Sequence, residues 1–161
     1  MSDVVIPITK SQEVRAAVKK VWAVVADLDN EHKPWPVLRR VKVLSKGKDT
    51  LEREVKIRRG PMGEAKSTQT LTVDPARLVT TLTMTKGPML GTRTIALTKV
   101  GDNETKIDVD WKFEMKGVPG FALDFVKDNI SGATEKALTQ IAEEAEGVDA
   151  SSDSIGTKVI S

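Results

Sequence analysis

The sequence predicts an α+β fold in which one antiparallel sheet is combined with two helical regions. Between Leu38 and Lys116, apolar and polar residues alternate with the period of two that is typical of strands. Short segments rich in Gly, Asp and Asn interrupt this alternation, which favours hairpins over parallel crossovers. Helical spacing occurs on either side of this region, in segments 11–27 and 119–146. A single sheet with two helices cannot cover both of its faces, so we expect it to curl around the last helix.

The composition indicates one soluble domain of 161 residues. The 25 basic and 23 acidic residues give a net charge of +2, and there are three Trp, three Phe and no Tyr. This small charge excess and low aromatic content argue against a nucleic-acid partner. The absence of cysteine excludes disulfides and thiol nucleophiles. Without a long apolar run or a signal-peptide pattern, we expect a cytoplasmic protein with no integral membrane association, and a monomer by default.

The N-terminal segment is predicted to form a strand followed by a helix. Residues 4–9 form the strand, and Pro7 places it near a sheet edge because proline has no N–H to donate. The helix is expected to begin at Ser11, a suitable cap, and to end near Asp27. Its apolar residues recur at three- and four-residue spacing: Val14, Ala17, Val18, Val21, Trp22, Val25 and Leu28. Segment 29–36 follows as a turn-rich connector, whose two prolines limit it to about one helical turn.

Six further strands are predicted, each with one apolar and one charged side. This pattern is typical of an antiparallel sheet with one wet face. The inward residues, in strand order, are Val41 and Val43; Leu51, Val55 and Ile57; Leu71 and Val73; Leu78, Leu82 and Met84; Ile95 and Leu97; and Ile107, Val109, Trp111, Phe113 and Met115.

The closing helix carries a broad apolar face, interrupted by Gly132 in its middle. A glycine there costs roughly 1 kcal/mol relative to alanine. Two interpretations of Gly132 stay open: tight packing against the sheet, or room left for a ligand. The remaining residues lack periodicity and are rich in Ser and Asp. We therefore expect one folded domain over residues 1–146 and a disordered tail over 147–161.

Three motifs link this order of elements to a known family: Val-Trp-Ala-Val-Val-Ala-Asp at 21–27, Lys-Pro-Trp-Pro at 33–36 and Val-Lys-Val-Leu at 41–44. Over about residues 4–146 the chain resembles the START-like (SRPBCC) superfamily of polyketide cyclase/dehydrase and lipid-transport proteins. The resemblance implies a helix-grip fold, in which a seven-stranded curved antiparallel sheet wraps around a long C-terminal helix, with helical segments between strands 1 and 2. It also implies an apolar cavity with its mouth among the hairpin loops at one end. By the up-and-down order, those loops are 60–63, 87–91 and 117–120.

The leading hypothesis on function is binding, transport or sensing of a small hydrophobic ligand (a lipid, isoprenoid or aromatic metabolite) in that cavity. Neither a cofactor nor a metal is expected. Met62, Met89, Leu90 and Phe121 are placed at the mouth. The full set of residues expected to contact the ligand is Val55, Ile57, Met62, Gln69, Leu71, Leu82, Met84, Met89, Leu90, Arg93, Ile95, Leu97, Val109, Trp111, Phe113, Phe121, Phe125, Val126 and Ile130.

Counting by twos also places polar residues on the inward side, namely Arg53, Arg93, Gln69 and Ser67. A buried guanidinium requires an anion or several acceptors, and a ligand carboxylate or phosphate or a protein carboxylate could supply them. A position at a strand end, reaching water or an acidic side chain, is the alternative.

Two further hypotheses on function remain. The first is a cyclase/dehydrase-type enzyme, for which Arg53, Arg93 and His32, the single histidine, are weak catalytic candidates. The missing Tyr and the lone His make catalysis the less favoured hypothesis. The second is an interaction module, like the helix-grip domains that activate a heat-shock chaperone. Its interior would be solid.

Overall fold

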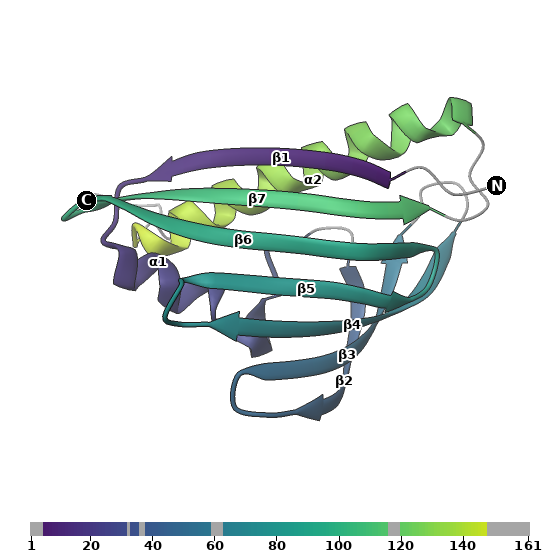
Figure 1. Ribbon diagram of the computed structural model, residues 1–161, viewed down its shortest axis with the longest axis horizontal. Helices are drawn as coiled ribbons and strands as arrows, with labels where there is room; N and C mark the ends of the chain where they lie inside the picture. The colour runs from purple at the N-terminus through teal and green to yellow at the C-terminus, as the bar shows by residue number, and fades with distance from the viewer. Residues whose placement is uncertain (1–4, 32, 36–37, 59–62, 116–119, 148–161) are drawn as a thin grey trace.

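All seven expected strands form one antiparallel sheet in the computed structural model, which describes residues 5–31, 33–35, 38–58, 63–115 and 120–147. The strand order across the sheet is β1-β7-β6-β5-β4-β3-β2, so every chain neighbour except β1 and β2 is also a spatial neighbour (Figure 1). The strands are β1 (Val5–Val14), β2 (Leu38–Lys46), β3 (Thr50–Arg58), β4 (Glu64–Asp74), β5 (Val79–Lys86), β6 (Met89–Gly101) and β7 (Glu104–Met115).

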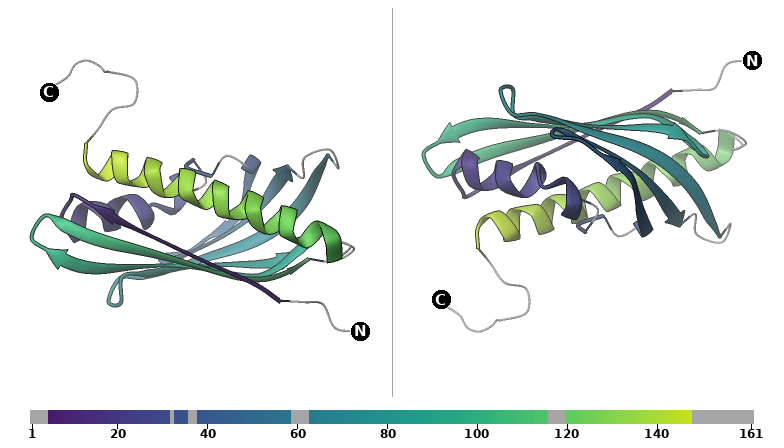
Figure 2. Two further views of the ribbon diagram at one scale, coloured as in Figure 1. Left: turned by 90° about the horizontal axis from the view of Figure 1, so that it is seen from above. Right: turned by 90° about the horizontal axis from the view of Figure 1, so that it is seen from below.

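The helices lie on one face of this curved sheet (Figure 2). They are α1 (Val18–Val25), the 3-10 turn η1 (Leu28–Asn30) and the long α2 (Gly120–Ala145), which crosses the concave face diagonally. The α+β class and the helix-grip arrangement are therefore confirmed. Pro7 does lie in an edge strand, since β1 closes one side of the sheet. None of the helices in the described ranges is long and apolar enough to cross a membrane.

The prediction of a helix starting at Ser11 is wrong. β1 continues to Val14, which pairs with Thr105 of β7, and α1 begins only at Val18. Val14 is fully buried by the sheet, so its apolar character fits a strand as well as the helical spacing that continues beyond it. The Thr105 hydroxyl donates to the Ala16 carbonyl at 2.8 Å, which holds the bend between the two elements.

The apolar core lies between the sheet and the C-terminal half of α2. The residues of α2 that are buried begin at Ala133 and recur to Ala145, whereas Leu123, Val126 and Ile130 are only partly buried. On the other side of the helix, Gly132 has no atom within 4 Å of where a Cβ would stand. Gly132 is therefore not tightly packed against the sheet.

The loop expected over residues 87–91 is shorter than predicted. β6 already begins at Met89, which is buried, so Leu90 pairs with Glu114 and points to the opposite face of the sheet. β6 can pair closely with β7 here because Gly91 has no side chain. A Cβ on it would come within 2.1 Å of the Lys112 carbonyl oxygen. The expected loops at 60–62 and 117–119 and the expected tail at 148–161 lie outside the described residues.

Candidate functional site

A charged cluster occupies the middle of the concave face. Along β3, the residues Leu51, Arg53 and Val55 are buried, and the charged residues between them face outward. This alternation places the Arg53 guanidinium inside, as the spacing predicted. Arg53 is in register with Gln69 on β4, and its Nε donates to the Gln69 Oε1 at 2.9 Å.

Arg93 reaches the same place from β6. It stands in register with Leu82 of β5 and Trp111 of β7, and it is 2% exposed. Arg53 is 0% exposed, so the interior holds two guanidinium groups that are shielded from water. Neither arginine lies at an exposed strand end, and both therefore need an anion close by.

Glu31 supplies that anion. It directly follows η1, and its side chain is 4% exposed. Its Oε1 lies 2.9 Å from the Arg53 Nη2, and its Oε2 accepts a hydrogen bond from the Arg93 Nη2. The contact with Arg53 is an ion pair that is not aligned as a hydrogen bond. One protein carboxylate thus bridges both arginines, which is one of the alternatives that the sequence left open.

The pKa values reflect this arrangement. Burial by itself would raise the pKa of the Glu31 carboxyl, but the charges of Arg93 and Arg53 and the hydrogen bond from Arg93 outweigh burial and hold that pKa below its ordinary value of 4.5. Burial lowers the pKa of the Arg53 guanidinium from 12.5, partly offset by the nearby Glu31. The Glu31 carboxyl is therefore ionised at neutral pH.

Within the described residues, the charges of the cluster are not balanced and some of its polar groups lack hydrogen-bond partners. Two guanidinium groups share one carboxylate, which leaves one positive charge without a partner among the described residues. Within the same ranges, the Arg53 Nη1, the Arg93 Nε and the Ser67 Oγ are buried without a hydrogen-bond partner. An unpaired buried polar group costs about 1–3 kcal/mol, and more if it is charged. The cluster therefore weakens the fold unless something else binds it.

Aromatic rings enclose the cluster. The Trp35 ring lies 4.4 Å from the Arg93 Cζ, and the Trp111 ring lies at 5.7 Å. Both distances suit cation–π attraction. Trp111 also makes edge contacts with Trp35 and Phe113, and its Nε1 donates to the Thr134 hydroxyl of α2 at 3.0 Å. These contacts fix the Arg93 side chain against the sheet.

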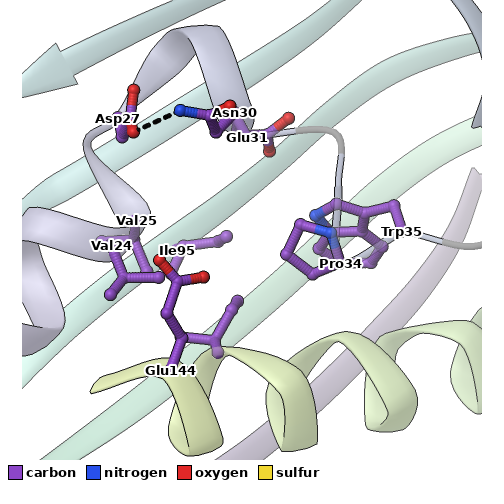
Figure 3. Close-up of a pocket in the computed structure, with 10 residues that line it drawn as sticks. Val24, Val25, Asp27, Asn30, Glu31, Pro34, Trp35, Ile95 and Glu144 are labelled. Atoms are coloured by element: carbon purple, nitrogen blue, oxygen red, sulfur yellow. Dashed lines mark hydrogen bonds between the residues drawn. The ribbon is translucent and has the colours of Figure 1, made fainter. Parts of the chain in front are cut away.

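The hollow that adjoins the cluster is much smaller than the expected cavity. Next to Glu31, a hollow of about 20 Å³ lies between α1, the connector and the C-terminal half of α2 (Figure 3). It has room for about one water molecule, whereas small-ligand pockets have roughly 300–1,000 Å³. The side chains around the cluster are closely packed, with Arg53, Arg93 and Phe113 almost fully buried.

A larger hollow of about 350 Å³ lies elsewhere, beside Trp22 of α1 and the turns near Lys48 and Pro75. Its wall includes the exposed ion pair between Lys46 and Asp29, at 2.7 Å. None of the unpaired buried atoms belongs to its lining. It is a surface groove outside the predicted site.

Most of the residues expected to contact a ligand are buried on the concave side. These are Val55, Ile57, Gln69, Leu71, Leu82, Met84, Met89, Arg93, Ile95, Leu97, Val109, Trp111 and Phe113. Val126 and Ile130 are partly buried on the side of α2 that continues the core face. Their contact with a ligand stays a prediction.

Other residues of the predicted set lie elsewhere. Phe125, expected inside, is 62% exposed, and Phe121 is 88% exposed. They stand four residues apart on one side of α2, away from Val126 and Ile130. Leu90 points outward, as described above. Met62 and His32 lie outside the described residues.

Two residues of the cluster were not predicted, Glu31 and Trp35. Both lie in the connector, where no periodicity indicates which way a side chain points. One signal was available: two inward arginines predict an acidic partner, and a carboxylate in the connector can approach the concave face.

The chain belongs to the family described as polyketide cyclase / dehydrase and lipid transport, whose model matches residues 6–146. This match covers both helices, all but the first residue of β1 and the whole charged cluster. No curated protein matches the chain significantly.

Solved structures with this fold resemble the protein at low sequence identity. TTHA0849 from Thermus thermophilus has a TM-score of 0.76 at 14% identity, covering 91% of this chain and 100% of that one. The Zhui aromatase/cyclase from Streptomyces sp. R1128 has 0.72 at 18%, covering 91% and 98%. A START superfamily protein from Mycobacterium smegmatis has 0.67 at 17%, covering 89% and 99%. At these identities the likeness concerns the fold.

Proposed function

We propose that the protein binds a small hydrophobic molecule between the N-terminal half of α2 and the concave face of the sheet. The observation that carries this proposal is the buried cluster of Arg53, Arg93 and Glu31, with donors left unpaired in an otherwise apolar interior. A charged cluster of this kind does not help a fold that needs only a core, because an apolar filling is often more stable. The family description, which includes lipid transport, supports the same function.

The bound state requires the N-terminal half of α2 to move outward. Leu123, Val126 and Ile130 are only partly buried, so displacing them exposes little apolar surface. A ligand entering there would replace these contacts with its own, at about 25 cal/mol for each Å² of apolar surface that it removes from water. The packed interior is then the ligand-free form. Cytoplasmic location and a monomeric state remain expectations.

The test is binding of apolar probes. Organic extracts of the purified protein would be analysed by mass spectrometry, and a fluorescent apolar probe would be titrated and then competed with lipids. We expect binding in the micromolar range. A matched pair of variants, Phe113→Ala inside and Phe121→Ala outside, separates the interior from the surface. Only the first should weaken binding. Absence of binding at tens of micromolar, for every probe, would contradict the proposal and favour an interaction module.

A cyclase/dehydrase-type reaction is the second candidate. It is favoured by the unpaired Arg53 Nη1 and Arg93 Nε, since buried donors stabilise negative charge that develops on a reacting oxygen. The Zhui protein is an aromatase/cyclase by its title, and this chain shares its fold. Turnover of a polyketide-like substrate that is lost in Arg93→Lys and retained in Arg77→Lys would support catalysis. Lack of turnover across a substrate panel would count against it.

A further inference from the structure

We infer that the preferred ligand is an apolar monocarboxylic acid whose carboxylate binds the arginine cluster. This inference rests on the proposed function and specifies its ligand. The first step is charge. Arg53 and Arg93 carry two positive charges, and Glu31 carries one negative charge. A ligand with a single negative charge neutralises the cluster, whereas a phosphate monoester, with nearly two, replaces a positive excess by a negative one.

The second step is the number of free donors. Glu31 uses one nitrogen of each arginine, and the Arg53 Nε is bound to Gln69. The Arg53 Nη1 and the Arg93 Nε remain without partners in the described part of the chain, as does the Ser67 hydroxyl. All three side chains are at most 2% exposed. They offer three donors, and the oxygens of a carboxylate accept hydrogen bonds readily.

The third step is position. Glu31 binds one nitrogen of each guanidinium group, so both arginines reach the same carboxylate from neighbouring parts of the sheet. Ser67 follows on β4, two residues from Gln69 on the same face and thus diagonal to Arg53. The sheet surface around them is apolar, with Met84 and Phe113 in the same row across the strands. An acidic head therefore fits at the cluster with an apolar body beside it.

The test compares three probes of one chain length by calorimetric titration at pH 7.5: decanoic acid, 1-decanol and decyl phosphate. We expect decanoate to bind at least tenfold more tightly than decanol, and more tightly than decyl phosphate. Decanol reports the hydrophobic site alone. If decanol binds as well as decanoate, the inference is overturned and the proposed function stands. If no probe binds, both are overturned. If decyl phosphate binds best, the monocarboxylate is overturned in favour of a dianion.

Substitutions test which side chains cause the preference for decanoate over decanol. Arg53→Met leaves a neutral pair of Glu31 and Arg93, so decanoate binding should fall at least tenfold relative to decanol binding. Arg77→Met, at an exposed arginine of the β4–β5 turn, is the matched control and should change neither. Ser67→Ala removes a hydroxyl without a partner, so it should fold normally and weaken decanoate a few-fold. If Arg53→Met does not fold, an unchanged preference for decanoate in both Ser67→Ala and Arg53→Lys overturns the inference.

Discussion

The two ends of the interior differ in what fills them, although one continuous helix covers both. Under the C-terminal half of α2, apolar residues such as Ala137, Leu138 and Ile141 pack against the sheet and α1. Near the middle of the sheet, beside the connector, the interior holds two arginines and a carboxylate, and the N-terminal half of α2 is only partly buried. The first end provides stability. The second is less stable because it buries charge, and it is where we propose that the ligand binds.

Removing the bridging carboxylate should have the largest effect on stability. Glu31→Gln leaves two buried guanidinium groups side by side without a counterion, and it should lower the free energy of unfolding by about 3–5 kcal/mol. Arg53→Met should cost less, because the remaining Glu31 and Arg93 form a balanced pair. Denaturant unfolding of both variants measures the difference. If Arg53→Met is the more damaging, the cluster does not carry the positive excess that we assign to it.

The second test makes the same change at both ends of α2. Leu138→Ala, at 2% exposure, should cost about 3 kcal/mol, within the range for buried leucine truncations. Leu123→Ala should cost about 1 kcal/mol or less, since Leu123 is only partly buried. Thermal and chemical unfolding provide both values. Equal losses would mean that the two halves are packed alike.

The dependence of stability on pH tests whether Glu31 is ionised in the folded protein. Because the pKa of Glu31 is lower in the folded protein than its ordinary 4.5, its ionised form adds stability above that pH. This contribution is lost as the pH falls below about 4.5 and through the lower pKa of the folded state. The stability difference between the wild-type protein and Glu31→Gln should therefore shrink on acidification. A difference that is constant between pH 7 and pH 3 would contradict the ion bridge.

The smallest expected effect is an increase in the free energy of unfolding. Gly132→Ala places a methyl group where no atom lies within 4 Å, and it restricts the unfolded chain. We expect a stabilisation of about 0.5–1 kcal/mol, measured by unfolding, with no change in probe binding. A loss of stability would show that the outer side of α2 is more closely packed than described.

The sequence predicted the strands well because a period of two follows directly from the geometry of a sheet. The same parity correctly placed Arg53, Arg93, Gln69 and Ser67 inside. The parity failed at Val43, which was predicted inward and is 51% exposed. The helical spacing failed at Val14, a position that fits strand and helix alike.

The partner of the arginines could not be located in the same way. Glu31 follows a 3-10 turn in an irregular connector, and only the tertiary fold brings it to the concave face. Along α2, the apolar pattern did not distinguish the exposed Phe121 and Phe125 from residues that face the sheet. An unpartnered apolar side chain and a buried one look alike in sequence.

Hydrogen exchange along α2 tests the central claim most directly. Exchange would be measured with and without saturating decanoate or 1-decanol. Ligand binding between α2 and the sheet predicts increased protection of amides 123–131, with amides 134–145 nearly unchanged. Bound probe without added protection in 123–131, or with protection confined to the surface groove beside Trp22 and Lys48, would contradict it.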